Sequence, residues 1–200
     1  MGLPKAAKKG IFSIEGDWDP DLRQHYSVEA GLRLLKEAEG IPYIHRRVGT
    51  AEEFEYYLHQ WTLKKYEAFP ILYLSFHGGP EGFWLPEDKK RVNTVTLDIL
   101  GDLLEDKCRG RIIHLGACAT LAMHNSRPKK FMQKTCALAV CGYTEEVGWT
   151  VSTAFEVILF YRMQRRAFNR AGAQRIHRDV DTLAKGLVQK LGFKMKVRPA

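Results

Sequence analysis

Short apolar runs alternate with amphipathic segments along most of this chain. Five runs have the length and composition of β-strands, at residues 10–15, 41–48, 69–76, 111–117 and 136–143. Apolar residues recur with a helical period at residues 27–39, from 50 onwards, at 96–106, from 153 to about 168 and at 171–190. Strands that alternate with helices form mostly parallel sheets with helices on both faces, so the pattern predicts an α/β fold.

Local signals refine the boundaries of these elements. Thr50-Ala-Glu-Glu53 and Thr153-Ala-Phe-Glu156 both have the spacing of a capping box, which predicts a helix start at each. The run 69–76 is almost continuously apolar, as expected of a strand buried on both faces of a parallel sheet. We expect a small hairpin at 78–95 and a loop or short helix at 120–134.

Length and composition are those of one globular domain. The 200 residues are 45% hydrophobic and 27% charged, and no apolar run approaches the roughly 20 residues of a membrane span. We therefore expect a basic N-terminal tail at 1–9, a single domain at 10–190 and a loose C-terminal tail at 191–200.

The cysteines and the net charge narrow the functional classes. None of the four cysteines forms a CxxC pair, which argues against a zinc knuckle or a thioredoxin-type site. Without a recognisable secretory signal, we expect reduced thiols in a cytoplasmic protein. The net charge of +8 could attract nucleic acid or an acidic partner, or belong to a solvated helix face. No nucleic-acid-binding motif is present, so neither nucleic acid nor a membrane is an expected partner.

Two of the apolar runs stop at a reactive side chain. The run 69–76 is followed by His77-Gly78-Gly79, and the run 111–117 by Cys118. Functional groups of open α/β sheets collect beyond the carboxyl ends of the strands, so these two ends could bring a base beside a thiol. The unperturbed pKa of histidine, about 6.5, suits the removal of a thiol proton. The amide of Gly78 could face a developing oxyanion.

Each of these signals has a structural alternative. A cysteine at the end of a strand is often a buried packing residue, and a lone histidine there is equally ambiguous. The joint placement of His77 and Cys118 on successive strands is more specific than either alone. Four further residues have a packing or loop interpretation as well as a functional one: His114, His124, Cys136 and Cys141. His77, Cys118 and His114 have no recognised metal-ligand spacing, so no metal is expected.

The order of these motifs resembles the clan CD cysteine peptidases, which have the caspase-like fold, and within them the bacterial CHAT-type group. The matching segments are Ser75-Phe-His-Gly-Gly79 after one apolar strand and Leu115-Gly-Ala-Cys-Ala-Thr120 after the next. The segment Ala137-Leu-Ala-Val-Cys-Gly-Tyr-Thr-Glu-Glu-Val147 and the helix after it also fit. The resemblance covers roughly residues 10 to 165.

This resemblance implies a three-layer caspase-like fold and peptide-bond hydrolysis through an acyl-enzyme thioester, without a cofactor. It assigns Cys118 as the nucleophile, His77 as the general base and acid, and Gly78 as an oxyanion donor. Compact bacterial members act as effectors, including in antiviral defence against phage. Control by a partner protein, a small ligand or self-cleavage is therefore expected, with a protein or peptide as substrate.

The resemblance also points to the residues that would select the substrate. The corresponding positions fall near Asp17 and Asp19, at Gly116, and near Glu145 and Glu146. Acidic side chains there would favour cleavage after Arg or Lys by charge complementarity. Asp17 and Asp19 could equally shape a turn. Trp149 could form a wall of the substrate pocket or simply cover the edge of the sheet.

The competing interpretation is a non-catalytic α/β domain that uses the same cleft to hold a nucleotide or a protein partner. The presence of both His77 and Cys118 argues against it. A P-loop NTPase or a serine hydrolase is disfavoured, because the chain has neither a GxxxxGK[ST] nor a GxSxG motif.

Overall fold

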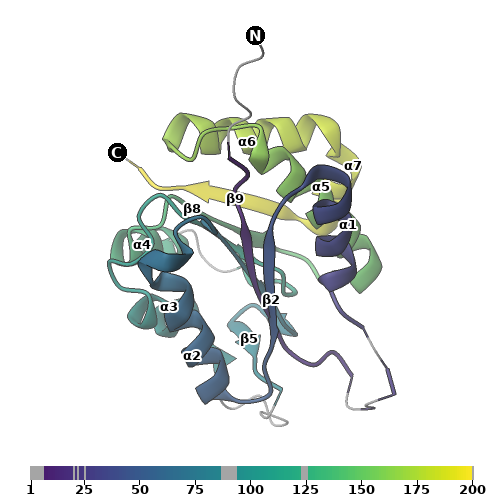
Figure 1. Ribbon diagram of the computed structural model, residues 1–200, viewed down its shortest axis with the longest axis vertical. Coiled ribbons are helices and arrows are strands. Elements are labelled where there is room, and N and C mark those ends of the chain that lie inside the picture. Colours follow the sequence, from purple (N-terminus) through teal and green to yellow (C-terminus); the bar gives the residue numbers. More distant parts are fainter. Residues whose placement is uncertain are drawn as a thin grey trace.

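A six-stranded sheet forms the centre of the protein (Figure 1). The computed structural model describes residues 7–19, 21, 23–24, 26–86, 94–122 and 126–199. The strand order is β2-β1-β3-β7-β8-β9, and every pair is parallel except β8 with β9. The strands are β1 (Ile11–Glu15), β2 (Tyr43–Arg47), β3 (Ile71–Ser75), β7 (Ile112–Leu115), β8 (Ala139–Tyr143) and β9 (Phe193–Val197).

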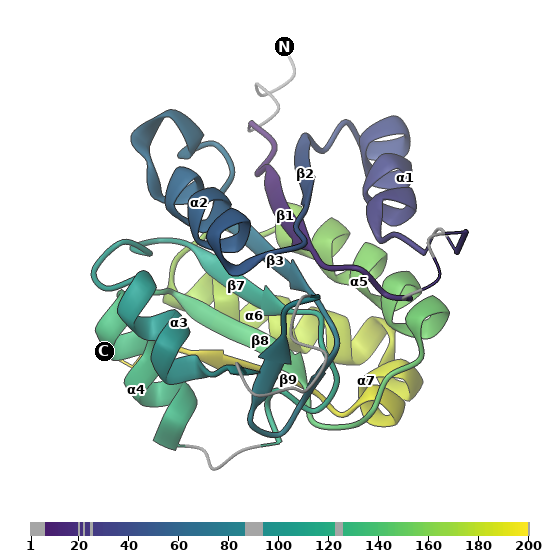
Figure 2. The ribbon, with the colours of Figure 1, turned by 90° about the horizontal axis from the view of Figure 1, so that it is seen from below.

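Helices cover both faces of this sheet, which gives the predicted three-layer α/β architecture (Figures 1 and 2). One layer contains α1 (Glu29–Glu39), α5 (Trp149–Gln164), α6 (Arg170–Leu183) and α7 (Lys185–Leu191). The opposite layer contains α2 (Ala51–Thr62), α3 (Leu97–Leu103) and α4 (Ser126–Thr135), with the short 3₁₀ helix η1 (Lys64–Tyr66) after α2. Within the described residues, no helix is both long and apolar enough to cross a membrane.

Strict alternation along the buried strands divides the core into two clusters. Ile11 and Tyr73 point to the α1/α5 layer, whereas Phe12 and Leu74 point to the α2/α3 layer. Strands β1 and β3 are fully buried because both faces are covered. This explains why the sequence of β3 is apolar at almost every position.

A second, smaller sheet lies near the lower end of the large one in Figure 1. It consists of the antiparallel strands β4 (Gly78–Gly79), β5 (Gly82–Trp84) and β6 (Thr94–Val95), and so confirms the predicted hairpin after the third strand. The expected hairpin also includes residues 87–93, which lie outside the described residues. The chain therefore leaves β3, makes this small sheet and returns through α3 to β7.

One of the two predicted capping boxes is present and the other is wrong. Thr50 accepts a hydrogen bond from the amide of Glu53 and caps α2 as predicted. Thr153, by contrast, lies inside α5, which begins at Trp149 after Gly148. Its hydroxyl donates to the carbonyl of Trp149, one turn earlier in the same helix. The Thr-x-x-Glu spacing at 153–156 therefore lies inside α5 and does not mark its start.

The predicted C-terminal tail at 191–200 is also wrong, because residues 193–197 form the sixth strand of the sheet. The predicted helix at 171–190 is divided into α6 and α7, and α7 ends at Gly192, whose φ of 59° is left-handed. From there Phe193 and Met195 are buried while Lys194 is exposed. This period of two marks a strand, but it spans only five residues and is flanked by basic ones.

Candidate active site at the ends of β3 and β7

His77 and Cys118 follow matching positions of two neighbouring parallel strands. In the β3–β7 register Leu74 is paired with Leu115, and the same register continued by three residues places His77 opposite Cys118. The segments stay close beyond the strands, since a Cβ atom added to Gly78 would lie 2.8 Å from the Cβ of Ala117. The ends of β3 and β7 thus bring an imidazole and a thiol to the same edge of the sheet.

The imidazole of His77 is exposed and is oriented by the backbone of Trp18. Its Nε2–H donates to the carbonyl oxygen of Trp18 at 2.8 Å, and the indole packs edge-on against the ring with 5.2 Å between centroids. A carbonyl can only accept a hydrogen bond, so this contact places the proton on Nε2. The Nδ1 atom of His77 is then the nitrogen that can accept a proton.

Trp18 is itself anchored by the buried carboxylate of Glu15, at the end of β1. The indole Nε1–H donates to Glu15 Oε1 at 2.5 Å, and His45 Nε2 lies 2.6 Å from Oε2. The hydroxyl of Ser27 and the amide of Val28 also donate to this carboxylate. Burial alone raises the pKa of Glu15, but these four hydrogen bonds outweigh it and lower the pKa overall. Glu15 is thus a fixed anion beneath the loop that holds the His77 ring.

Cys118 lies in a turn that the loop after β8 holds in place. The amide of Val147 donates to Sγ at 3.4 Å, and Sγ lies 3.6 Å from the carbonyl oxygen of the same residue. The next residue, Ala119, has a φ of 52°, which is uncommon for a residue other than glycine, and its amide donates to the carbonyl of Glu145. Both backbone groups of Val147 thus contact the Cys118 sulfur and fix its position.

The amide of Gly78 is not used by the small sheet. Trp84 N–H donates to the carbonyl of His77, which makes these two residues a hydrogen-bonded pair of β4 and β5. Gly78, one position further, is therefore in a non-hydrogen-bonded pair with Phe83, and its N–H points away from β5. Among the described residues no acceptor holds this amide, so its direction is compatible with the expected oxyanion role.

A second buried carboxylate, Glu156 of α5, lies under Gly116. A Cβ atom at Gly116 would lie 2.5 Å from the Tyr73 ring and 3.0 Å from Glu156 Oε1. Glu156 accepts hydrogen bonds from the hydroxyls of Tyr73 and Tyr143, and burial raises the pKa of both phenols well above its usual value, with the Glu156 charge adding to the effect. Gly116 thus fits because a packed polar cluster leaves no space for a side chain.

His114 belongs to this buried cluster and not to the edge of the sheet where His77 and Cys118 lie. The ring is fully buried, and its Nε2–H donates to Glu156 at 3.0 Å while Nδ1 lies 3.4 Å from the Cys141 sulfur. This confirms the packing interpretation of His114 and Cys141. Among the described residues, no group of three His, Cys, Asp or Glu side chains could hold a metal ion.

The four acidic residues predicted near the site have different surroundings. Asp17 forms an ion pair with Arg47 at 2.6 Å, and Asp19 accepts from the amide of Asp21, as expected of a residue that shapes a turn. Glu145 and Glu146 are exposed in the loop after β8. Glu145 lines a pocket with Gly192, Phe193 and Lys194, so its side chain is directed towards the β9 side of this loop.

Trp149 is half-buried at the start of α5. Its ring lies 5.8 Å from that of Tyr26, and its indole Nε1 is buried without a hydrogen-bond partner among the described residues. Trp149 thus packs against the loop before α1. It follows Val147, whose amide donates to Cys118, by two residues.

The remaining cysteines differ from Cys118 in environment. Burial raises the pKa of Cys108 to about 12 and that of Cys141 higher still. Cys136 is half-buried and lies 3.3 Å from the carboxylate of Asp106, so it is only in part the packing residue that the pattern indicated. His124 and its neighbour Asn125 lie outside the described residues.

Sequence reasoning missed three residues of this region: Glu15, Trp18 and Glu156. Glu156 was hidden because its spacing from Thr153 resembled a helix cap. A charged residue at the end of an apolar strand was the signal available for Glu15. Nothing in the sequence marks the carbonyl of Trp18, because a backbone contact across the fold leaves no side-chain pattern.

Fold and site together define a three-layer α/β protein with a histidine and a cysteine at the ends of two adjacent parallel strands. The chain belongs to a family of unknown function (DUF6642), which matches residues 8–196. No curated protein matches the sequence.

Proposed function

We propose that this protein is a cysteine endopeptidase that uses His77 and Cys118. The observation that carries the proposal is the hydrogen bond from His77 Nε2 to the Trp18 carbonyl, because it leaves Nδ1 as the base on the strand next to Cys118. A base oriented by a third group beside a thiol is the arrangement that nucleophilic catalysis requires.

In the proposed reaction Nδ1 of His77 takes the proton of the Cys118 thiol, and Sγ attacks the carbonyl carbon of the scissile bond. The amide of Gly78 stabilises the oxyanion that forms. His77 then gives its proton to the leaving amine, and the C–N bond breaks to leave a thioester. Water, deprotonated by His77, hydrolyses the thioester and restores the free thiol.

The amide of Val147 supports the first step. It donates to Sγ and so stabilises the negative charge on sulfur before attack. The anion of Glu15 supports the imidazolium stage at longer range, through Trp18, because it holds the carbonyl that accepts from His77.

We propose cleavage after a basic residue, with Glu146 as the selecting carboxylate and Glu145 beside it on the same loop. Both are exposed on the loop that contacts Cys118 and Ala119. Asp17 is already neutralised by Arg47, so the proposal rests on the β8–α5 loop more than on the β1 loop. The resemblance noted from the motifs further suggests a cytoplasmic effector, in defence against phage, switched on by a protein or a small ligand.

The test is covalent labelling by a peptidyl acyloxymethyl ketone with Arg at the position before the reactive carbon. We expect the wild type to be labelled at Cys118, Cys118→Ala to be unlabelled and His77→Ala to react more slowly. Cys136→Ala is the matched control, since it removes the other half-buried thiol and should leave the rate unchanged. Peptide mapping that finds the label on Cys136 while Cys118 is inert would overturn the assignment.

A further inference from the structure

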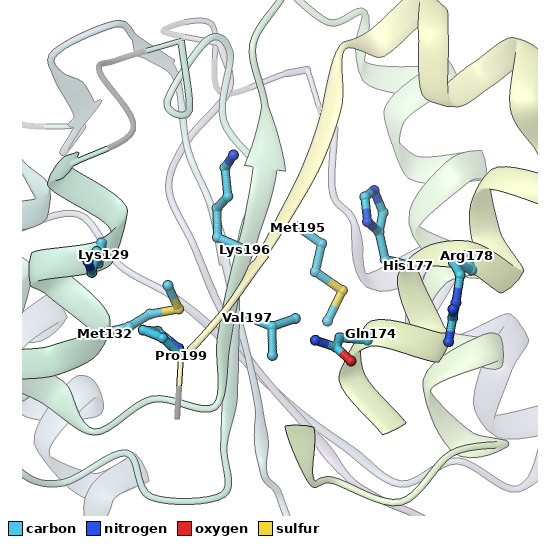
Figure 3. Close-up of a pocket in the computed structure, with 9 residues that line it drawn as sticks. All are labelled: Lys129, Met132, Gln174, His177, Arg178, Met195, Lys196, Val197 and Pro199. Atoms are coloured by element: carbon cyan, nitrogen blue, oxygen red, sulfur yellow. The ribbon is translucent and has the colours of Figure 1, made fainter. Parts of the chain in front are cut away.

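A basic groove lies at the open edge of the sheet (Figure 3). In the strand order, β8 separates this edge strand, β9, from β7, which leads to Cys118. The groove has a volume of about 750 Å³. Its floor is β9, and Figure 3 shows α4 on one side of this strand and α6 on the other. The lining residues are Lys129, Met132, Gln174, His177, Arg178, Met195, Lys196, Val197 and Pro199.

The outer edge of β9 offers unused backbone groups. The carbonyl of Gly192 and the amide of Arg198 both bond towards β8, so the even-numbered residues between them also face that strand. Consequently Phe193, Met195 and Val197 direct their N–H and C=O groups outwards. No further strand is paired with β9 in the described part of the chain. Such an edge can accept one more strand.

The charge of the groove is positive at the end formed by Lys196. Lys129 and Arg178 are the other charged side chains that line it, and no carboxylate of the described residues lines it. None of the three cations has an ion-pair partner within the described residues. Burial lowers the pKa of His177, with Lys194 and Lys196 acting in the same direction against Asp181, so this ring adds no charge near neutral pH.

The two faces of β9 differ in character. Lys194 and Lys196 alternate with Met195 and Val197, and the apolar pair belongs to the core on the α5–α7 side. Side chains of an added strand would alternate in the same way. One of its faces would lie beside the two lysines of β9, and the other beside Met195 and Val197. Carboxylates would therefore suit the face of the two lysines, and apolar side chains the other face.

From these features we propose that the β9 edge binds an extended acidic peptide segment of a partner protein, in which acidic and apolar residues alternate. The peptide would add as a seventh strand and be held by the outward backbone groups of Met195 and Val197. Its carboxylates would lie near Lys129 and Lys196, because Lys194 lines a neighbouring pocket together with Glu145 and Asp181. This site is separate from His77 and Cys118 and does not depend on the proposed peptidase activity.

The same charges argue against a second copy of this chain at the edge. If β9 paired with itself antiparallel about Met195, Lys194 would lie opposite Lys196 of the other copy. Like charges directly opposite each other destabilise a strand pair, and lysines on edge strands prevent such pairing. Nucleic acid is disfavoured too, because the groove floor is a strand edge with apolar side chains rather than aromatic rings for base stacking.

The test measures the binding of a fluorescent peptide of about eight residues, with Glu and Val in alternation, to the full chain by anisotropy. We expect binding that weakens with salt, and a loss of about tenfold in Lys129→Glu/Lys196→Glu. Lys36→Glu/Lys64→Glu is the matched control, with the same change of net charge at exposed sites elsewhere. An equal loss of peptide affinity in both double variants would contradict binding at the β9 edge.

A backbone variant tests strand addition separately from charge. Val197→Pro removes one outward N–H and leaves the ladder to β8 intact, which edge strands tolerate. We expect Val197→Pro to weaken binding while Val197→Ala, which shortens the same side chain, retains most of it, with both variants folded by thermal melting. A peptide N-methylated at alternate residues should fail to bind.

Three outcomes would contradict the proposal. If a disordered polyglutamate binds as tightly as the alternating peptide, the groove attracts negative charge only and does not bind an added strand. Tighter binding of an oligonucleotide of equal charge would replace the peptide by nucleic acid. Dimer formation in sedimentation velocity that Val197→Pro abolishes would assign the edge to a second copy.

Discussion

His77 Nε2 donates to the backbone carbonyl of Trp18 at 2.8 Å, so a histidine at the end of β3 is oriented by a loop that follows β1. That loop is fixed by Glu15, which accepts from the Trp18 indole. The relationship connects the end of the neighbouring strand to the candidate base. It also makes the buried anion of Glu15 the residue on which the geometry of His77 depends.

Glu15→Gln should therefore change the pH dependence of stability. The folded-state pKa of Glu15 lies below its unfolded value, so its contribution is fully present above the unfolded pKa of about 4.3 and is lost as pH falls through the folded pKa. In urea unfolding, Glu15→Gln should be less stable than wild type near pH 7, and the gap should narrow in acid. Glu37→Gln, at an exposed position, should follow the wild-type curve. A constant gap from pH 7 to pH 3 would contradict this account.

Gly116→Ala should destabilise the fold. A methyl group at this position would lie 2.5 Å from the Tyr73 ring and 3.3 Å from the Leu74 carbonyl, so side chains of the buried cluster must move. We expect a loss of about 1–3 kcal/mol in chemical denaturation. Gly186→Ala is the control, since nothing lies within 4 Å of its added Cβ in α7, and it should be neutral or stabilising by up to about 1 kcal/mol. If Gly116→Ala is as stable as wild type, the side chains around Gly116 can move to make room for the methyl group, which would contradict this account.

Replacing the Glu156 carboxylate should lower the stability of the fold more than removing one of the hydroxyls that donate to it. In Glu156→Gln, one of the two acceptor oxygens becomes an NH₂ group, which can only donate. Whichever way the amide turns, at least one of the buried groups that donate to Glu156, such as His114 and Tyr143, loses its acceptor. We expect a loss of about 1–3 kcal/mol, and about 1 kcal/mol for Tyr143→Phe. Thermal unfolding measures both. A Tyr143→Phe variant less stable than Glu156→Gln would contradict the central role of the carboxylate.

The alternation of apolar runs was sufficient to predict the parallel strands and their layers, because burial on two faces leaves a strong signal in β1, β3 and β7. It also predicted that His77 and Cys118 follow neighbouring strands, a placement the register now supports. It was not sufficient for β9, whose exposed lysines resemble a solvated tail. The surroundings of Asp17 could not be predicted either, since its partner Arg47 lies on another strand.

The two Thr-x-x-Glu segments provide a direct comparison between a real cap and an apparent one. Thr50→Ala should destabilise the protein by about 1 kcal/mol, because it leaves the amide of Glu53 without its acceptor at the start of α2. Thr153→Ala should cost less than about 0.5 kcal/mol, since its hydroxyl only donates to a carbonyl within α5. Chemical denaturation of both variants measures the difference. The reverse order would restore the capping interpretation of Thr153.

The four thiols should divide into two classes by reactivity in the native protein. Cys108 and Cys141 are fully buried, and burial raises the pKa of each, so neither thiolate nor access is available. Cys118 and Cys136 are half-buried, and within the described part of the chain an amide is directed at the sulfur of Cys118 but not at that of Cys136. Brief treatment with iodoacetamide near pH 7, followed by peptide mass mapping, should find Cys118 modified first and Cys136 second. Cys108 and Cys141 should react only after unfolding in urea. Modification of Cys141 at the rate of Cys118 in the folded protein would mean that the β8 side of the core opens, and would contradict its place in the buried cluster.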